Sequence, residues 1–97
     1  FVYNMTDNEL MDLVKSLLEK QFSPTILKIK DESAAHAGHA GAQGGMKHLA
    51  LTISSDTLDN LSKILAHKAI YQALGSLMET HIHALRIKII NSGQNQP

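Results

Sequence analysis

The segment KHLALTISSDT, residues 47–57, joins a strand pattern to a helix start. Leu49, Leu51 and Ile53 alternate with more polar residues, which is typical of a strand with one buried face. The Ser-Asp-Thr sequence at 55–57 follows at once, and these residue types cap the first turn of a helix. A strand that leads directly into a helix predicts the first half of a strand–helix–strand connection.

On the C-terminal side of this segment, we predict helical structure to about residue 79, with a break near Asp59 and Asn60. The apolar residues that recur there at helical spacing are Ala66, Ala69, Ile70, Ala73, Leu74 and Leu77. Residues 82–90 alternate and predict a last strand. Its predicted apolar face carries His83, Leu85, Ile87 and Ile89. A strand–helix–strand connection makes its two strands parallel.

Two further elements are predicted on the N-terminal side. Thr6 and Glu9 have the spacing of a capping box, in which each residue binds the backbone amide of the other. Apolar residues at helical spacing follow, so we predict a helix over residues 7–21. Residues 25–30 alternate between apolar and polar side chains and predict another strand.

The predicted order is therefore α-β-β-α-β. It indicates a single α+β domain over residues 1–97, with helices packed on a three-stranded mixed sheet. The ends, at 1–5 and 91–97, are predicted to be disordered tails because they lack apolar periodicity.

The amino-acid composition limits the classes of function that this chain can have. Nine basic residues balance nine acidic ones, so the formal net charge is zero. This argues against strong nucleic-acid binding, which needs clustered lysine and arginine. The chain has no cysteine, so any metal that it binds must be held by histidine or carboxylate groups. No apolar run approaches the roughly 18 residues of a membrane span. We expect a cytoplasmic protein that is monomeric when alone.

The loop DESAAHAGHAGAQGG, residues 31–45, carries His36 and His39 among glycines and alanines. Strand directions place this loop at the same end of the sheet as the starts of the second and third strands. His48 and the pair at 81 and 83 lie at those starts. His67 lies elsewhere, about 20 Å back along the helix at 1.5 Å per residue.

This convergence favours a metal site, because neutral imidazole binds zinc, iron and copper. Other interpretations stay open at each position. His83 shares the predicted apolar face and would also suit the edge of the core. His48 falls on the polar face, so we interpret it as solvated, and His36 and His39 would also suit a polar loop. Tyr71 is predicted to be in the core, with His67 packed against it one turn away.

Three motifs resemble those of the BolA family, and the resemblance extends over nearly the whole chain, from the first helix to Ile90. They are the loop DESAAHAGHAG at 31–41, the helix SDTLDNLSKILAHKAIYQAL at 55–74 and the strand IHALRI at 82–87. The resemblance implies a fold similar to class II KH domains. It also implies a monothiol glutaredoxin as partner, with a [2Fe–2S] cluster shared between the two proteins and glutathione.

The resemblance implies that the cluster ligands of this chain are His36, with His39 as the alternative loop ligand, and His83. The thiolates would come from glutaredoxin and glutathione. We therefore predict a non-enzymatic accessory protein in iron–sulfur cluster trafficking or iron sensing, and iron–sulfur apo-proteins are further expected partners.

The alternative is a KH-like transcriptional regulator that binds nucleic acid through His67, Lys68 and Lys63. Ala66 and Lys68 stand where the family pattern has arginines beside the helix histidine, and this substitution weakens the alternative. Catalysis is not expected, since no cysteine or paired-carboxylate signature is present.

Overall fold

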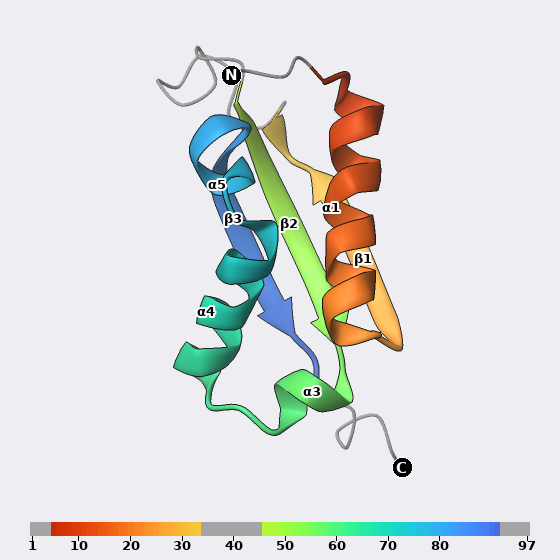
Figure 1. Ribbon diagram of the computed structural model, residues 1–97, viewed down its shortest axis with the longest axis vertical. Coiled ribbons are helices and arrows are strands. Elements are labelled where there is room, and N and C mark those ends of the chain that lie inside the picture. Colours follow the sequence, from red (N-terminus) through yellow and green to blue (C-terminus); the bar gives the residue numbers. More distant parts are fainter. Residues whose placement is uncertain (1–4, 34–45, 92–97) are drawn as a thin grey trace.

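The computed structural model describes residues 5–33 and 46–91. In chain order the elements are α1 (Asp7–Phe22), β1 (Ile26–Asp31), β2 (Lys47–Ser54), α3 (Asp56–Asp59), α4 (Lys63–Leu74), α5 (Leu77–Thr80) and β3 (Ile82–Ile89) (Figure 1). The predicted α-β-β-α-β order is confirmed, with the long helical stretch divided into α3, α4 and α5. None of the helices in the described ranges is long and apolar enough to cross a lipid bilayer.

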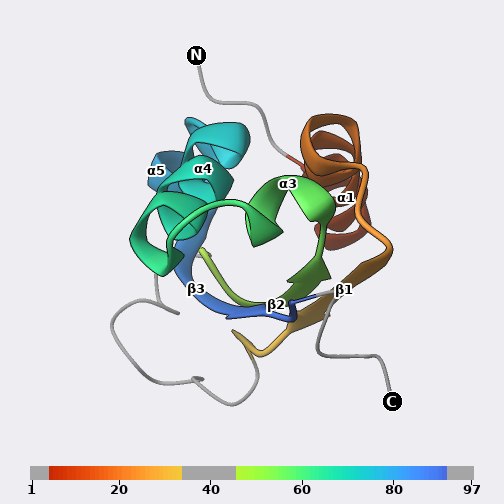
Figure 2. The same cartoon turned by 90° about the horizontal axis from the view of Figure 1, so that it is seen from below.

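The sheet has the order β1-β2-β3. β1 pairs with β2 antiparallel, and β2 pairs with β3 parallel, as the strand–helix–strand connection predicts. All the helices lie on one side of the sheet, with α1 on one flank and α4 and α5 on the other (Figure 2). No helix formed by residues 5–33 or 46–91 covers the opposite face of the sheet. The α+β class and the three-stranded mixed sheet are therefore confirmed.

The helix α1 has defined signals at both ends. The side-chain oxygen of Thr6 accepts a hydrogen bond from the Glu9 amide at 3.1 Å, and Glu9 Oε1 accepts one from the Thr6 amide at 3.0 Å. This is the predicted capping box. At the other end Ser23 takes a left-handed conformation with φ 44°, and Pro24 follows it, so the helix cannot continue.

Two local signals divide the helical stretch after β2. Ser62 starts α4, because its side-chain oxygen accepts a hydrogen bond from the Leu65 amide at 3.2 Å. Gly75 ends α4 with φ 57°, a backbone conformation that residues with a Cβ rarely adopt. The predicted break near Asp59 and Asn60 is confirmed, but the one at Gly75 was not predicted.

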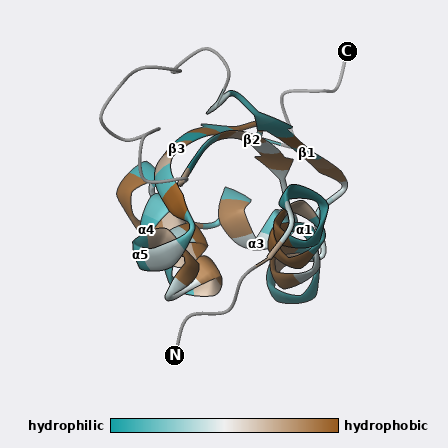
Figure 3. Cartoon of the chain, turned by 90° about the horizontal axis from the view of Figure 1, so that it is seen from above, coloured by the Kyte–Doolittle hydropathy of each residue, from teal (hydrophilic) through white to brown (hydrophobic). Residues whose placement is uncertain are grey.

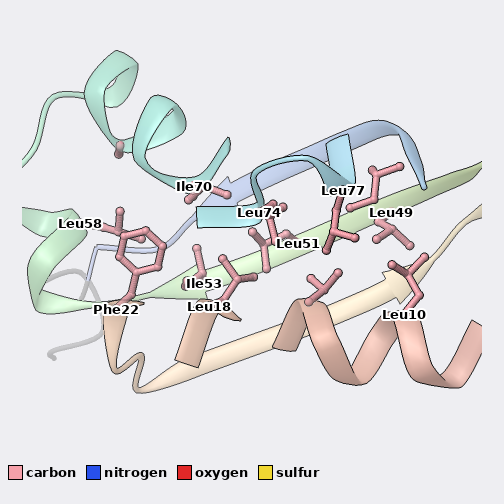
Figure 4. Close-up of a cluster of buried hydrophobic side chains, with 13 residues drawn as sticks. Leu10, Leu18, Phe22, Leu49, Leu51, Ile53, Leu58, Ile70, Leu74 and Leu77 are labelled. Carbon is pink, nitrogen blue, oxygen red and sulfur yellow. The ribbon is translucent and has the colours of Figure 1, made fainter. Parts of the chain in front are cut away.

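The hydrophobic core lies between the sheet and the helical layer. The ribbons of α1 and of the strands alternate between hydrophobic and hydrophilic residues (Figure 3). Side chains from α1, β2, α4 and α5 meet in this layer (Figure 4). The buried residues are Leu10, Val14, Leu18, Phe22, Leu49, Leu51, Ile53, Leu58, Ala66, Ile70, Leu74, Leu77 and Ile82.

Tyr71 is not part of this core. Its side chain is 40% exposed, so the prediction that it is buried was wrong. Ala66, Ile70 and Leu74 occupy the buried stripe of α4, spaced four residues apart, and Tyr71 lies one position off that stripe.

The two ends of the chain were predicted to be disordered tails. Met5 packs against the core, whereas residues 1–4 and 92–97 lie outside the described residues.

The two isoleucines of α4 should separate core packing from helix propensity. Ile70 is fully buried, whereas Ile64 is 74% exposed. We expect Ile70→Ala to lower the free energy of unfolding by about 2–5 kcal/mol, because it leaves a cavity. Ile64→Ala makes the same chemical change at the surface and should alter it by less than about 0.5 kcal/mol. Urea denaturation followed by circular dichroism measures both, and equal effects would contradict this core.

Candidate functional site

The start of β3 contains an irregularity that determines where His83 lies. Lys47 pairs with Ile82, but the next residue of β2, His48, pairs with Ala84. His83 is therefore the extra residue of a β-bulge. Beyond the bulge, Leu85 and the alternate residues after it face the core in register with the apolar residues of β2.

The bulge corrects the prediction that His83 shares a face with Leu85. Ile82 is fully buried, and His83 is exposed. Strict alternation would place His83 with Leu85 and Ile82 on the opposite face, but one extra residue shifts the alternation by one position. The structure thus exposes the imidazole that the alternation pattern alone assigns to the core edge.

His48 and His83 lie next to each other at this end of the sheet. Their ring centroids are 5.1 Å apart, and the ring planes are tilted by 54°. His48 is only 9% exposed, so its interpretation as a solvated residue was wrong. It lies in the central strand, with β3 on one side and the end of β1 on the other. Its carbonyl accepts a hydrogen bond from the Glu32 amide at 2.7 Å.

Ser33 connects this histidine to the acidic end of β1. The His48 amide donates to Ser33 Oγ at 3.1 Å, and the Ser33 amide donates to Asp31 Oδ1 at 2.8 Å. Lys47 Nζ lies 3.8 Å from Asp31 Oδ2 and 3.1 Å from Asp7 Oδ2. The first turn of α1, the end of β1 and the start of β2 are thereby joined beside the histidine pair.

These contacts set the pKa of Asp31. Partial burial raises the pKa of this carboxyl, but hydrogen bonds from the side chain and backbone of Ser33 lower it, as do the nearby charges of Lys47 and His48. The net result is a pKa below the ordinary value. Asp31 therefore remains ionised next to the histidines at neutral pH.

Another predicted histidine, His81, lies at the same end of the sheet. His81 Nδ1 is 2.7 Å from Thr80 Oγ1, and the His81 carbonyl accepts a hydrogen bond from the Lys47 amide at 2.9 Å. The predicted convergence of the histidines at 48, 81 and 83 is thus confirmed. His36 and His39 lie outside the described residues, within the segment 34–45. That segment begins after Ser33, which contacts His48.

The described residues at this end of the sheet offer imidazole groups for binding. His83 offers an exposed imidazole on a strand, and the ring of His48 lies 5.1 Å from it, centroid to centroid. In the ranges 5–33 and 46–91, no group of three or more histidine, cysteine, aspartate and glutamate side chains is placed to hold a metal ion.

His67 lies at a different site, as predicted. It lines a cavity of about 590 Å³ between the helical layer and the C-terminal half of β3. Lys63, Arg86 and Lys88 also line this cavity, whereas Lys68 is not among its lining residues. The sequence interpretation missed Arg86 and Lys88. The signal for them was present, since they alternate on the polar face of the last strand.

Comparison with known proteins adds to this geometry. The family model described as BolA-like protein matches residues 18–94. This range includes the pair His48 and His83 and the residues that line the cavity beside β3. This chain belongs to the BolA-like family.

Relatives of this BolA-like chain include two plant proteins and one bacterial protein. The SufE-like protein 1, chloroplastic/mitochondrial, of Arabidopsis thaliana is 35% identical over 79 residues, which cover 76% of this chain and 21% of that protein. Protein BOLA1, chloroplastic, of the same plant is 32% identical over 77 residues, covering 76% and 48%. The DNA-binding transcriptional regulator BolA of Haemophilus influenzae is 29% identical over 80 residues, covering 82% and 75%.

The fold agrees with that of a solved relative. The BolA domain of SufE1 from Arabidopsis thaliana superposes with a TM-score of 0.75 at 28% identity, covering 94% of this chain and 99% of that domain. This chain spans less than half the length of the two plant proteins that it matches in sequence.

The lowered pKa of Asp31 predicts a pH dependence of stability. A carboxyl whose folded pKa lies below its unfolded value stabilises the fold above the unfolded pKa. That contribution disappears as the pH falls through the folded pKa. Asp31→Asn should therefore be less stable than the parent at neutral pH, and the difference should shrink in acid. Chemical denaturation at a series of pH values measures it. A difference that stays constant down to about pH 2, below the ordinary pKa of aspartate, would contradict the assignment.

Proposed function

We propose that this BolA-like protein binds a monothiol glutaredoxin and contributes histidine ligands to a shared [2Fe–2S] cluster. The role is non-enzymatic and serves iron–sulfur cluster trafficking or iron sensing. The observation that carries the proposal is the His48–His83 pair, with ring centroids 5.1 Å apart at the end of the sheet next to the segment 34–45.

His83 has the properties of a ligand offered to another protein. The bulge holds its backbone within a paired strand, and its imidazole is exposed. The ring of His48 lies beside it, with the ring centroids 5.1 Å apart. A ligand fixed in this way binds with a smaller loss of conformational freedom than one on an unstructured chain. His36, or His39 in its place, is the proposed second ligand of this chain.

The ligand chemistry explains why a partner is needed. This chain has no cysteine, and a [2Fe–2S] cluster takes four ligands, usually thiolates. Glutaredoxin and glutathione would supply the thiolates in our proposal. Histidine in place of cysteine on one iron raises the reduction potential, as in Rieske centres. The role of this chain is then to supply imidazole nitrogen and to cover one side of the bound group.

The test compares two histidines of this chain. His83→Ala should abolish the visible circular dichroism of the cluster formed with a holo monothiol glutaredoxin, because it removes the exposed ligand. His67→Ala is the matched control: it removes the same side chain at the cavity beside the far end of β3 and should leave that spectrum unchanged. Far-ultraviolet circular dichroism checks that both variants are folded.

Loss of the spectrum in His67→Ala but not in His83→Ala would contradict the proposal, because it would place the cluster at the cavity beside the C-terminal half of β3. A stable brown colour after reconstitution of this chain alone with iron and sulfide would also overturn the shared-cluster proposal. The single variants His36→Ala and His39→Ala, with the double variant, identify the loop ligand. If the two histidines substitute for each other, only the double variant will lose the spectrum.

A second function is nucleic-acid binding. Two observations favour it: one bacterial relative is named a DNA-binding transcriptional regulator, and Lys63, Arg86 and Lys88 line one cavity. The zero net charge and Ala66 in the helix weigh against it.

We expect weak DNA binding without sequence preference at about 150 mM salt, because few phosphates can be neutralised. Fluorescence anisotropy with duplex and single-stranded oligonucleotides measures it. Sub-micromolar, sequence-selective binding under these conditions would favour the regulator over the cluster-sharing role.

A further inference from the structure

We propose that the cavity beside β3 is a docking groove for an extended, acidic peptide segment of a partner protein, which pairs with β3 as an added strand. This groove is lined by the C-terminal half of β3 and by residues of α4 and of the α3–α4 region. It is separate from the histidine pair, and the inference does not rest on cluster binding.

The open edge of β3 provides the backbone partner. β3 is the last strand of the sheet, and no other strand in the described part of the chain pairs with its outer side. The Ile90 amide donates to the Ile53 carbonyl at 2.9 Å, so Ile90 faces β2. Backbone groups alternate in direction along a strand, so those of Ile87 and Ile89 face outward. Such a row of donors and acceptors is the template for strand addition.

The charges along this edge select an acidic segment. Lys63 comes from the start of α4, and Arg86 and Lys88 come from β3. Among the described residues that line the groove, only Asp59 is acidic. Arg86 is already paired with Glu32, with Nη2 and Oε2 2.8 Å apart. Neither Lys63 nor Lys88 forms a salt bridge in the ranges 5–33 and 46–91. These two lysines are therefore available for carboxylates of a partner.

The groove also has an apolar part, which favours a peptide with alternating side chains. Leu58 and Ala66 are buried at the groove, and Leu61 is exposed beside them. In an added strand, successive side chains point to opposite faces of the sheet. Aliphatic side chains would face Leu58 and Ala66 in the helical layer. Acidic ones would face Arg86 and Lys88 on the open side, and an acidic residue at the end of the peptide would meet Lys63 at the start of α4. A volume of about 590 Å³ can hold several such side chains.

The lining residues favour a peptide over single-stranded nucleic acid. Proteins that bind single strands stack bases on aromatic rings in addition to contacting phosphates. Among the described residues that line the groove there is no Phe, Tyr or Trp, and His67 is the one residue with a ring. The backbone edge, by contrast, offers hydrogen bonds that a peptide main chain can complete.

The test uses a blocked peptide of alternating glutamate and valine, about seven residues long, which is close to the usual length of a strand. We expect its addition to ¹⁵N-labelled protein to shift the amide resonances of Ile87 and Ile89 and to slow their exchange with solvent. A peptide in which lysine replaces every glutamate should not do so. N-methylation of the backbone on the edge-facing residues should abolish binding, and N-methylation of the alternate residues should preserve it.

Charge reversals locate the binding surface. Lys88→Glu and Lys63→Glu should each weaken binding of the acidic peptide by about tenfold, because each replaces an attractive contact with a repulsive one. Lys63→Glu keeps the helix, since acidic residues are favoured in the first turn. Lys28→Glu is the matched control. Lys28 pairs with Thr52, which pairs with Lys88, so it lies on the same face at the opposite edge. Its reversal should change the affinity by less than about twofold at moderate salt.

Three results would overturn the inference. Equal weakening by Lys28→Glu would mean that the peptide responds to overall charge and not to the groove. Shifts confined to β1 would place it at the other edge of the sheet. Binding of a thymidine oligonucleotide at Ile87 and Ile89, without binding of the peptide, would assign the groove to nucleic acid. His83→Ala should leave peptide binding intact, so failure here is distinguishable from failure of the cluster-sharing proposal.

Discussion

Parallel pairing of β2 with β3 requires the chain to return along the whole sheet between them, and α3, α4 and α5 make that return. The connection covers one face of the sheet and supplies Leu58, Ile70 and Leu74 to the core. It also brings the starts of both strands to the same end. His48 and His83 are neighbours in space because these two strands begin together.

The bulge at His83 converts that alignment into a candidate binding site. Ile82 still reaches the core, and Leu85 still faces it, but the residue between them gains exposure. In a regular strand with Leu85 facing the core, His83 would also face the core and Ile82 would be exposed. One extra residue thus allows both the burial of Ile82 and the exposure of the His83 imidazole on the same strand.

The two ends of β3 offer different chemistry. At its start, imidazole groups lie beside the ionised Asp31 and the end of β1. Farther along, Lys63, Arg86 and Lys88 surround a groove beside the open edge. The sheet keeps these regions apart, so a partner could engage one without blocking the other.

The sequence by itself determined the helix and strand types, the capping box at Thr6, the parallel sense of the last two strands and the end of the sheet at which the histidines gather. These follow from local periodicity, cap chemistry and the handedness rules of short connections. Tertiary structure alone decided that His48 is buried, that His83 is exposed and that Tyr71 lies off the core stripe. Burial depends on strand order and on one inserted residue, and neither is visible in an alternation pattern, because a shift by one position reverses every side chain that follows.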